Sequence, residues 1–415
     1  METWKKNTAL FLAGQGVSLL GSSLVQYAIM WHITLTTQSG AMMTISILCG
    51  FLPHFFMSPF AGVWADRFDR KKLINLSDGM IAAVTLIAAV IFLSGYSELW
   101  LLFAISSVRA LGGAVQAPAV GAFLPQLVPQ EKLTRIGGIN SSLQSSIMLV
   151  SPMLGAFLLS VAPIEIIFFI DVVTAAAAIF ILLKFLNVPA HKRAGEAKTT
   201  GYFGDLKLGV KYIMSHGYIK LFFAFAAVFN ILVAPVAFLT PLQVTRSFGG
   251  EYWQLSAIEI AFSFGMIAGG AVIAAWGGFK NKMYTLTLSC LIFGVCTFAI
   301  GVVQAFFVYL AFLAVMGLGM PAFNTSSMVF IQEKVEEEYL GRVMGVMNMI
   351  ATSMMPLSML FFGPLSDAVP IETLLVITGP LMAVLALAML GCRPLIRAGR
   401  PAAKEAAPAE PIPGQ

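Results

Sequence analysis

Three of the charged residues inside the long apolar stretches of the sequence are the first candidates for chemistry, because a charge is unfavourable there. Arg109 lies in the fourth of twelve such stretches, Asp171 in the sixth and Glu259 in the eighth. A charge at the centre of a membrane span costs about 2.5–3.5 kcal/mol on an insertion scale unless it is paired or hydrated. A carboxylate that moves between wet and dry surroundings can bind and release a proton, and an arginine can tune it. We therefore expect these three residues to serve proton coupling.

The three charges also have structural alternatives. Asp171 lies at a depth that suits pairing with Arg109, but it could equally tie its helix to a neighbouring helix. Glu259 could lie near the membrane boundary and reach water. Because Arg109 can hold Asp171 in place while the stretch around Glu259 has no cation, Glu259 is the first candidate for the proton carrier and Asp171 the second.

A second set of candidates consists of polar residues at helical spacing. Gln15, Ser18, Ser22 and Gln26 are spaced by three, four and four residues, so they form one stripe along a helix. Such a stripe lines a wet cavity or makes hydrogen bonds between helices, and the glycines beside it suit close packing. We expect a substrate cavity. Residues of two later stretches are candidates for the same cavity: Asn140, Gln144, Asn348 and Thr352.

The composition indicates that these residues lie in an integral membrane protein. Of 415 residues, 58% are hydrophobic and 11% are charged, which is too apolar for a soluble globule. The stretches do not alternate every second residue as barrel strands would, so they predict twelve transmembrane helices in an all-α protein. The predicted spans are roughly 10–36, 41–65, 73–95, 99–124, 136–161, 165–187, 217–245, 254–277, 283–300, 306–331, 341–366 and 371–391.

The basic residues predict the orientation of the spans. Of the 25 Lys and Arg residues, 23 fall in segments on one side of a twelve-span protein. Cytoplasmic loops carry the excess of basic residues. We therefore expect a multi-pass protein of the cell membrane with both termini in the cytoplasm. The net charge of +5 reflects this topology and does not indicate a nucleic-acid partner.

One long polar segment divides the chain into two halves of six spans. We expect a first bundle over 1–187, a cytoplasmic linker over 188–216, a second bundle over 217–392 and a disordered tail over 393–415. Apolar residues at helical spacing over 203–213 predict an amphipathic helix on the cytoplasmic leaflet, or alternatively a helix that binds a partner. The halves also repeat weakly in sequence, with matching residues 207 positions apart.

The sequence lacks the patterns that most enzymes need. It has no nucleophile with a base, no phosphate-binding loop and no metal-ligand spacing. We therefore expect no enzymatic activity, no metal site and no cofactor, so that a proton gradient supplies the energy. The four cysteines lie in or beside apolar stretches and are expected to be free thiols.

The most specific motif lies in the turn after the second span. The sequence Gly-Val-Trp-Ala-Asp-Arg-Phe-Asp-Arg-Lys from residue 62 resembles the major facilitator superfamily signature Gly-x-x-x-Asp-Arg-x-Gly-Arg-(Arg/Lys). Asp69 replaces the second glycine, which puts a tight glycine turn in question. The resemblance implies the major facilitator fold, two pseudo-symmetric bundles of six helices. It also implies a conformational latch in which Asp66 meets the start of the eleventh span. The matching residues are Gly62, Asp66, Arg67, Arg70 and Lys71.

Further motifs resemble those of drug and proton antiporters within that superfamily. The residues around Arg109, Arg-x-x-Gly-Gly-x-Val-Gln-Ala, resemble the motif of the fourth helix, which implies that Arg109 assists proton coupling. Pro152 and Gly155 belong to a worn copy of the antiporter motif Gly-Pro-x-x-Gly-Gly. The segments 18–23 and 124–131 resemble macrolide-efflux permeases and siderophore exporters.

The resemblance implies proton-coupled efflux of amphipathic small molecules, such as macrolide-type drugs, by alternating access. A dedicated exporter of one compound, such as a siderophore or a lipid, is the alternative within transport. A non-transporting membrane receptor or scaffold is the alternative from another class, but it has little need of buried charge in both halves. The expected partners are a small-molecule substrate and the lipid bilayer, and we expect a monomer.

Overall fold

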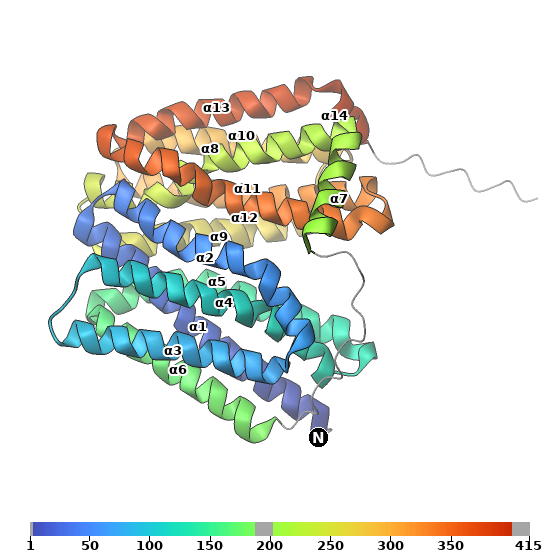
Figure 1. Ribbon diagram of the computed structural model, residues 1–415. Helices are drawn as coiled ribbons and strands as arrows, with labels where there is room; N and C mark the ends of the chain where they lie inside the picture. The colour runs from blue at the N-terminus through green and yellow to red at the C-terminus, as the bar shows by residue number, and fades with distance from the viewer. Residues whose placement is uncertain (1–2, 187–201, 401–415) are drawn as a thin grey trace, which may run out of the picture.

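The computed structural model describes residues 3–186 and 202–400, and helices make up nearly all of this part of the chain (Figure 1). No strand occurs in these residues. The elements are α1 (Thr3–Thr37), α2 (Gly40–Arg67), α3 (Arg70–Leu93), α4 (Leu99–Leu127), the short 3₁₀ turn η1 (Gln130–Lys132), α5 (Leu133–Val161), α6 (Ile164–Phe185), α7 (Tyr202–Ser215), α8 (Gly217–Ser247), α9 (Tyr252–Trp276), α10 (Lys282–Val302), α11 (Phe306–Lys334), α12 (Glu337–Ala368), α13 (Ile371–Gly391) and α14 (Arg393–Ala398).

Twelve of the described helices are long and apolar enough to cross a membrane, namely α1 to α6 and α8 to α13. They coincide with the twelve spans predicted from the sequence. A helix bonds all its backbone groups within its own segment, which hydrocarbon requires. The prediction of an all-helical membrane protein is confirmed.

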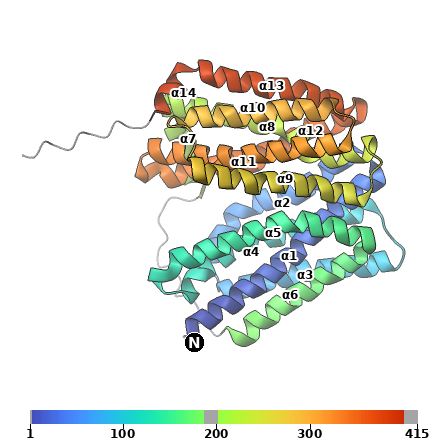
Figure 2. The ribbon, with the colours of Figure 1, turned by 180° about the vertical axis from the view of Figure 1, so that it is seen from behind.

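The twelve spans form two bundles, α1–α6 and α8–α13, which lie below and above each other in Figure 1 and can be followed from behind in Figure 2. The bundles meet mainly where α2 packs on α12 and where α5 packs on α9. The start of α1, α7 and α14 all lie at one end of the spans. We call this end the terminal face and the opposite end the far face.

Glycines let the helices of the second bundle approach one another closely. A Cβ atom added to Gly265 of α9 would lie 3.0 Å from the Cα of Gly317 of α11. One turn later, a Cβ on Gly269 would lie 2.8 Å from the Cα of Leu318. Small residues at such crossings are typical of membrane helices. Lipid provides no hydrophobic force between helices, so they associate through the close packing that small residues allow.

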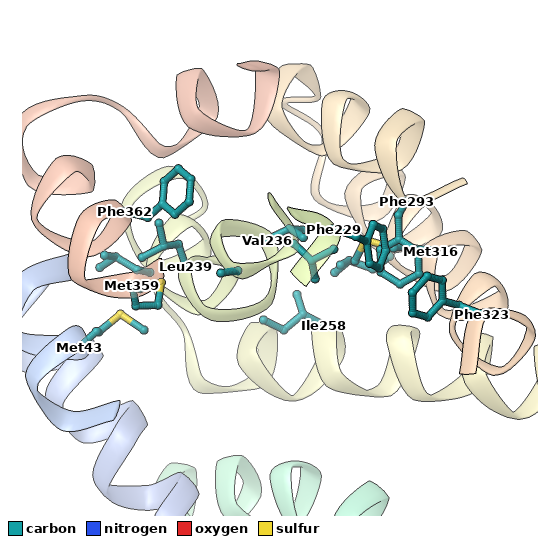
Figure 3. Close-up of a cluster of buried hydrophobic side chains, with 14 of the residues drawn as sticks. Met43, Phe229, Val236, Leu239, Ile258, Phe293, Met316, Phe323, Met359 and Phe362 are labelled. Carbon is teal, nitrogen blue, oxygen red and sulfur yellow. The ribbon is translucent and has the colours of Figure 1, made fainter. Parts of the chain in front are cut away.

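The core of the second bundle is aromatic. The rings of Phe229 and Phe323 stack with their centroids 4.6 Å apart, and the ring of Phe293 meets that of Phe229 edge-on at 5.5 Å. Figure 3 shows these three side chains gathered together, with Met316 beside them. The interior of the first bundle contains, besides apolar side chains, the polar and charged clusters described below.

The amphipathic segment forms α7, which packs against α12 and α8. Asp205 of α7 makes an ion pair with Arg342 of α12 at 3.0 Å, and Tyr212 stacks on Tyr339 at 4.6 Å. Gly209 permits the contact, since a Cβ there would lie 2.8 Å from the carbonyl oxygen of Arg342. The predicted helix is present, and its tyrosine side is covered by the protein itself, while its contact with the cytoplasmic leaflet stays a prediction.

The predicted linker and tail fall partly outside the described residues, which exclude 187–201 and 401–415. The start of the predicted tail is structured, because α14 forms there and its Leu395 side chain is fully buried. Asn281 donates a hydrogen bond from its side chain to the carbonyl of Ile396 at 2.8 Å, which ties α14 to the start of α10.

Candidate functional site

A buried ion pair lies inside the first bundle. Arg109 of α4 donates to a carboxylate oxygen of Asp171 of α6 at 2.5 Å, and the two side chains are 9% and 0% exposed. The hydroxyl of Thr85 of α3 accepts a hydrogen bond from Arg109 and lies 3.2 Å from the same oxygen of Asp171. The predicted pairing of Arg109 with Asp171 is confirmed.

Helix α1 completes this cluster. The Ser22 hydroxyl donates to the second oxygen of Asp171 at 3.0 Å, and Arg109 donates to the Ser22 carbonyl at 3.1 Å. Gly21 makes room for the contact, since a Cβ there would lie 3.1 Å from the Cα of Asp171. Four helices thus converge on one ion pair, and we call Ser22, Thr85, Arg109 and Asp171 the arginine layer.

A second polar layer lies two helical turns away. Gln116 of α4 donates from its side-chain amide to Asp78 Oδ1 of α3 at 2.5 Å, and its amide lies 3.4 Å from Gln15 Oε1 of α1. Asp78 is only 2% exposed. We call Gln15, Asp78 and Gln116 the aspartate layer.

The two layers share three helices. Gln15 is seven residues from Ser22, Asp78 is seven from Thr85, and Gln116 is seven from Arg109. Residues seven apart lie on the same face of a helix, so each pair points to the same side. This spacing was a signal in the sequence, but Asp78, Thr85 and Gln116 were not among the predicted site residues.

The polar stripe of α1 therefore divides between two surroundings. Ser18 is 2% exposed and faces Asp78, and Gln15 and Ser22 bond within the bundle. These three residues thus make the hydrogen bonds between helices that were the alternative to a cavity, and their contact with substrate stays a prediction. Gln26 is exposed and remains a candidate for the cavity.

The cavity candidates on α5 and α12 are accessible. Gln144, Asn348 and Thr352 are exposed and Asn140 is half-buried. The Thr352 hydroxyl donates to the Asn348 carbonyl of its own helix at 2.8 Å. Both helices begin at the terminal face, so these residues stand in the half of the molecule nearer that face. Their contact with substrate stays a prediction.

Glu259 lies in α9 and faces the first bundle. Its side chain is half-buried, and it makes no hydrogen bond or ion pair within the described part of the chain. Tyr27 of α1 is within electrostatic reach of it. Glu259 thus lies between the bundles, whereas Asp171 is locked inside one of them.

A cluster of hydrogen bonds closes the bundles against each other at the far face. The Asp367 carboxylate, at the end of α12, accepts from the backbone amides of Gly40 at 2.7 Å and Ala41 at 3.0 Å and from the Ser39 hydroxyl at 2.8 Å. The first amides of α2 have no hydrogen-bond partner within the helix, and the helix dipole is positive at this end, so the start of α2 attracts an anion.

Arg246 of α8 completes this contact. It donates to Asp367 at 2.8 Å, to the Ser366 carbonyl at 2.6 Å and to the Gln38 carbonyl at 2.5 Å. We call Ser39, Gly40, Arg246 and Asp367 the far-face clasp. Neither Arg246 nor Asp367 was predicted as a site residue, because each looked like an ordinary charge at the end of a span.

The two bundles lie further apart at the terminal face than at the far face in Figures 1 and 2. A Cβ added to Gly62 of α2, or to Gly341 or Gly345 of α12, would meet no atom within 4 Å. The side chain of Asp66, which was predicted to latch the bundles here, is outside the described residues. The latch therefore stays a prediction.

The other signature residues hold the first bundle together. Asp69 caps α3 by accepting from the Lys72 amide at 3.3 Å, and its φ of −64° needs no glycine. Arg70 donates to the Ala122 carbonyl of α4 at 2.8 Å, and Lys71 donates to the Leu186 carbonyl at 2.8 Å. Arg67 is exposed.

The antiporter-like motif lies at a close helix crossing. Pro152 of α5 is buried, and a Cβ on Gly155 would lie 3.4 Å from the Cβ of Tyr27 and 3.5 Å from the ring of Trp31. The described residues contain no group of His, Cys, Asp or Glu suited to a metal ion. The four cysteines are free thiols.

Two bundles that meet at one face, with buried charge in one of them, have counterparts among known proteins. Residues 8–359 match the family model of the Major Facilitator Superfamily. The chain belongs to the major facilitator superfamily. This membership makes it a multi-pass transporter of the plasma membrane, not an enzyme, with a small molecule as its substrate.

The relatives of this superfamily member include exporters. It is 28% identical to Macrolide efflux protein A of Streptococcus pyogenes over 92% of its own chain and 95% of that protein. It is 22% identical to the Staphyloferrin A transporter of Staphylococcus aureus over 87% of its chain and 89% of that protein. A crystal structure of a bacterial homologue of the human lysosomal transporter Spinster has the same fold, with a TM-score of 0.69, 13% identity and coverage of 97% and 100% of the two chains.

Proposed function

We propose that this transporter exports amphipathic small molecules, such as macrolide-type drugs, in exchange for protons. Its similarity to Macrolide efflux protein A spans 95% of that protein and supports efflux. The observation that carries the transport mechanism is the far-face clasp, which joins the bundles at one face while glycines at the other face stand free.

In the proposed cycle the bundles rock about the substrate site. The distribution of basic residues favours a cytoplasmic terminal face, in which case the far face would be external and the clasp would close the outer end. The predicted latch of Asp66 against the start of α12 would close the cytoplasmic end in the opposite state. Because α2 and α12 take part in both contacts at opposite ends, the two contacts would exclude each other.

Proton coupling is proposed for Glu259, with the arginine layer in support. Glu259 lies between the bundles without a cation partner, so a change of state would change its access to water. Asp171 is held by Arg109 at 2.5 Å, which favours the role of second candidate. No cofactor takes part in this scheme, and one chain contains every residue that it uses.

The substrate class is proposed from the side chains available to line a cavity between the two bundles. The sequence holds 33 Phe and 22 Met residues, and such side chains adapt to varied apolar shapes. The exposed polar residues of α5 and α12 offer hydrogen bonds. The Staphyloferrin A transporter among the relatives makes a siderophore the specific alternative.

An efflux assay in a host lacking its own drug pumps tests this function. Cells that make the protein should retain less of a labelled macrolide than cells that make the Arg109→Ala variant, and a protonophore should abolish the difference. Equal retention of every macrolide, together with export of a labelled siderophore, would support the alternative. Equal retention of all compounds in the panel would contradict export.

A further inference from the structure

Asp78 is a buried carboxylate that the mechanism above leaves without a task. Its Oδ1 accepts from Gln116 at 2.5 Å, but its Oδ2 is enclosed and has no hydrogen-bond partner among the described residues. Buried polar atoms are rarely left unpaired, and a buried charge without a partner costs far more than a buried neutral group. The unpaired oxygen therefore calls for a cation.

None of the helices around Asp78 supplies a cation to pair with its carboxylate. From α1 it faces Gln15 and Ser18, and from α4 it faces Gln116, all of which are neutral. From α6 the charged group nearest to it is the carboxylate of Asp171, which is paired with Arg109.

The nearest cations are bound elsewhere. Arg109 gives its donors to Asp171, Thr85 and the Ser22 carbonyl. Arg70, at the turn between α2 and α3, donates to the carbonyls of Ala65 and Ala122.

A metal ion suits this place poorly. Hard cations take about six or more oxygen ligands, and the described residues hold no cluster of three acidic, histidine or cysteine side chains. A proton needs only the one free oxygen. Binding forms a single O–H bond at Oδ2 and removes the charge, and release returns the proton to water.

We propose that Asp78 is a second proton-binding carboxylate of this transporter, coupled to the Arg109–Asp171 pair through Gln116 and Gln15. The proposal rests on the proton coupling proposed above and adds a site within the first bundle to the one at Glu259. The coupling is mechanical. Gln116 shares α4 with Arg109, and Gln15 shares α1 with Ser22, so a change in the bonds to Asp78 moves the helices that hold the ion pair.

Infrared difference spectroscopy on the purified full-length protein tests the site without a substrate. As pH is stepped, a protonated carboxyl group gives a C=O stretching band. The band should weaken in Asp78→Asn and persist in Glu98→Gln, a control that removes an exposed carboxylate with no capping hydrogen bond. Gln116→Leu should move the pH at which the band changes, which covers the case in which Asp78→Asn does not fold.

Transport in proteoliposomes separates this site from the wider function. Asp78→Asn should lower accumulation driven by a pH gradient by about tenfold while substrate exchange without a gradient stays within about twofold. An unchanged band and unchanged accumulation in Asp78→Asn, with both lost in Glu259→Gln, would overturn the site and leave proton coupling intact. Wild-type protein that responds to a sodium gradient but to no pH gradient would overturn proton coupling itself.

Discussion

At the scale of single residues, the arginine layer lowers the stability of the protein, and we expect its charges to serve transport. Both charges are buried, so removing one partner leaves the other without compensation, whereas replacing both with apolar residues removes the problem. The sequence predicted this pair correctly, because a charge in a span is rare enough to demand a partner.

Arg109→Ala should destabilise the protein by about 3–5 kcal/mol and abolish uphill efflux, because Asp171 stays buried without its cation. Substrate binding should change only a few-fold, since a largely apolar ligand does not need the guanidinium. The double variant Arg109→Met with Asp171→Leu should recover most of the stability but not the transport. Thermal unfolding, ligand binding and transport into vesicles measure the three quantities, and accumulation against a gradient by Arg109→Ala would refute the role.

Glu259→Gln should remove the pH dependence of efflux and leave only downhill movement, because the amide cannot bind a proton that the cycle must carry. Transport measured against pH in proteoliposomes gives the answer, with Glu98→Gln as the control. A Glu259→Gln protein with the wild-type pH profile and full uphill transport would remove Glu259 from the mechanism.

The sequence could not show which polar residues face water. Ser18 and Gln26 belong to one stripe, yet Ser18 is buried against Asp78 and Gln26 is exposed. The difference depends on which helices pack on α1, and periodicity along one helix holds no information about its neighbours. Asp78 was overlooked although it lies inside the predicted span 73–95, and only the placement of α3 beside α4 identifies Gln116 as its partner.

At the scale of helices, the sequence predicted the spans well and their contacts poorly. Apolar stretches of the right length give the twelve helices because the bilayer fixes their length. The contacts of α7 with the protein were not predicted, since an apolar face can be covered by lipid or by protein. Its partners Arg342 and Tyr339 lie in α12, more than 120 residues further along the chain.

Close helix contacts give a prediction with a matched control. Gly269→Val should lower the melting temperature, because its Cβ would lie 2.8 Å from the Cα of Leu318 and push α9 from α11. Overpacking of this kind costs about 1–3 kcal/mol. Gly270→Val makes the same chemical change one residue later, where no atom lies within 4 Å, and should have little effect. Equal losses in the two variants would show that the crossing does not depend on Gly269.

At the scale of the whole molecule, the structure shows one conformation, in which the far-face clasp joins the bundles and the glycines of α2 and α12 at the terminal face have open space beside them. Asp367 and Arg246 are each about one-third exposed, at 31% and 29%, so their ion pair is worth only about 1 kcal/mol after solvent screening. A contact of this strength can bias two states without trapping the protein in one of them.

The central claim is that α2 and α12 part at one face as they meet at the other, and spin-label distances at both faces test it most directly. Labels on Ile45 and Leu360 would report the far face, since both residues are exposed. Labels on Gly62 and Gly345 would report the terminal face, where added atoms meet open space.

In a background without native cysteines, Asp367→Asn should lengthen the far-face distance and shorten the terminal-face distance in the same molecules. Asp66→Asn should do the reverse. Glu372→Gln is the matched control, because Glu372 bonds to Ser247 within its own bundle at 2.5 Å, and its distances should stay as in the wild type. If Asp367→Asn left both distances unchanged, or lengthened both together, the bundles would not alternate about the clasp and the account would be contradicted.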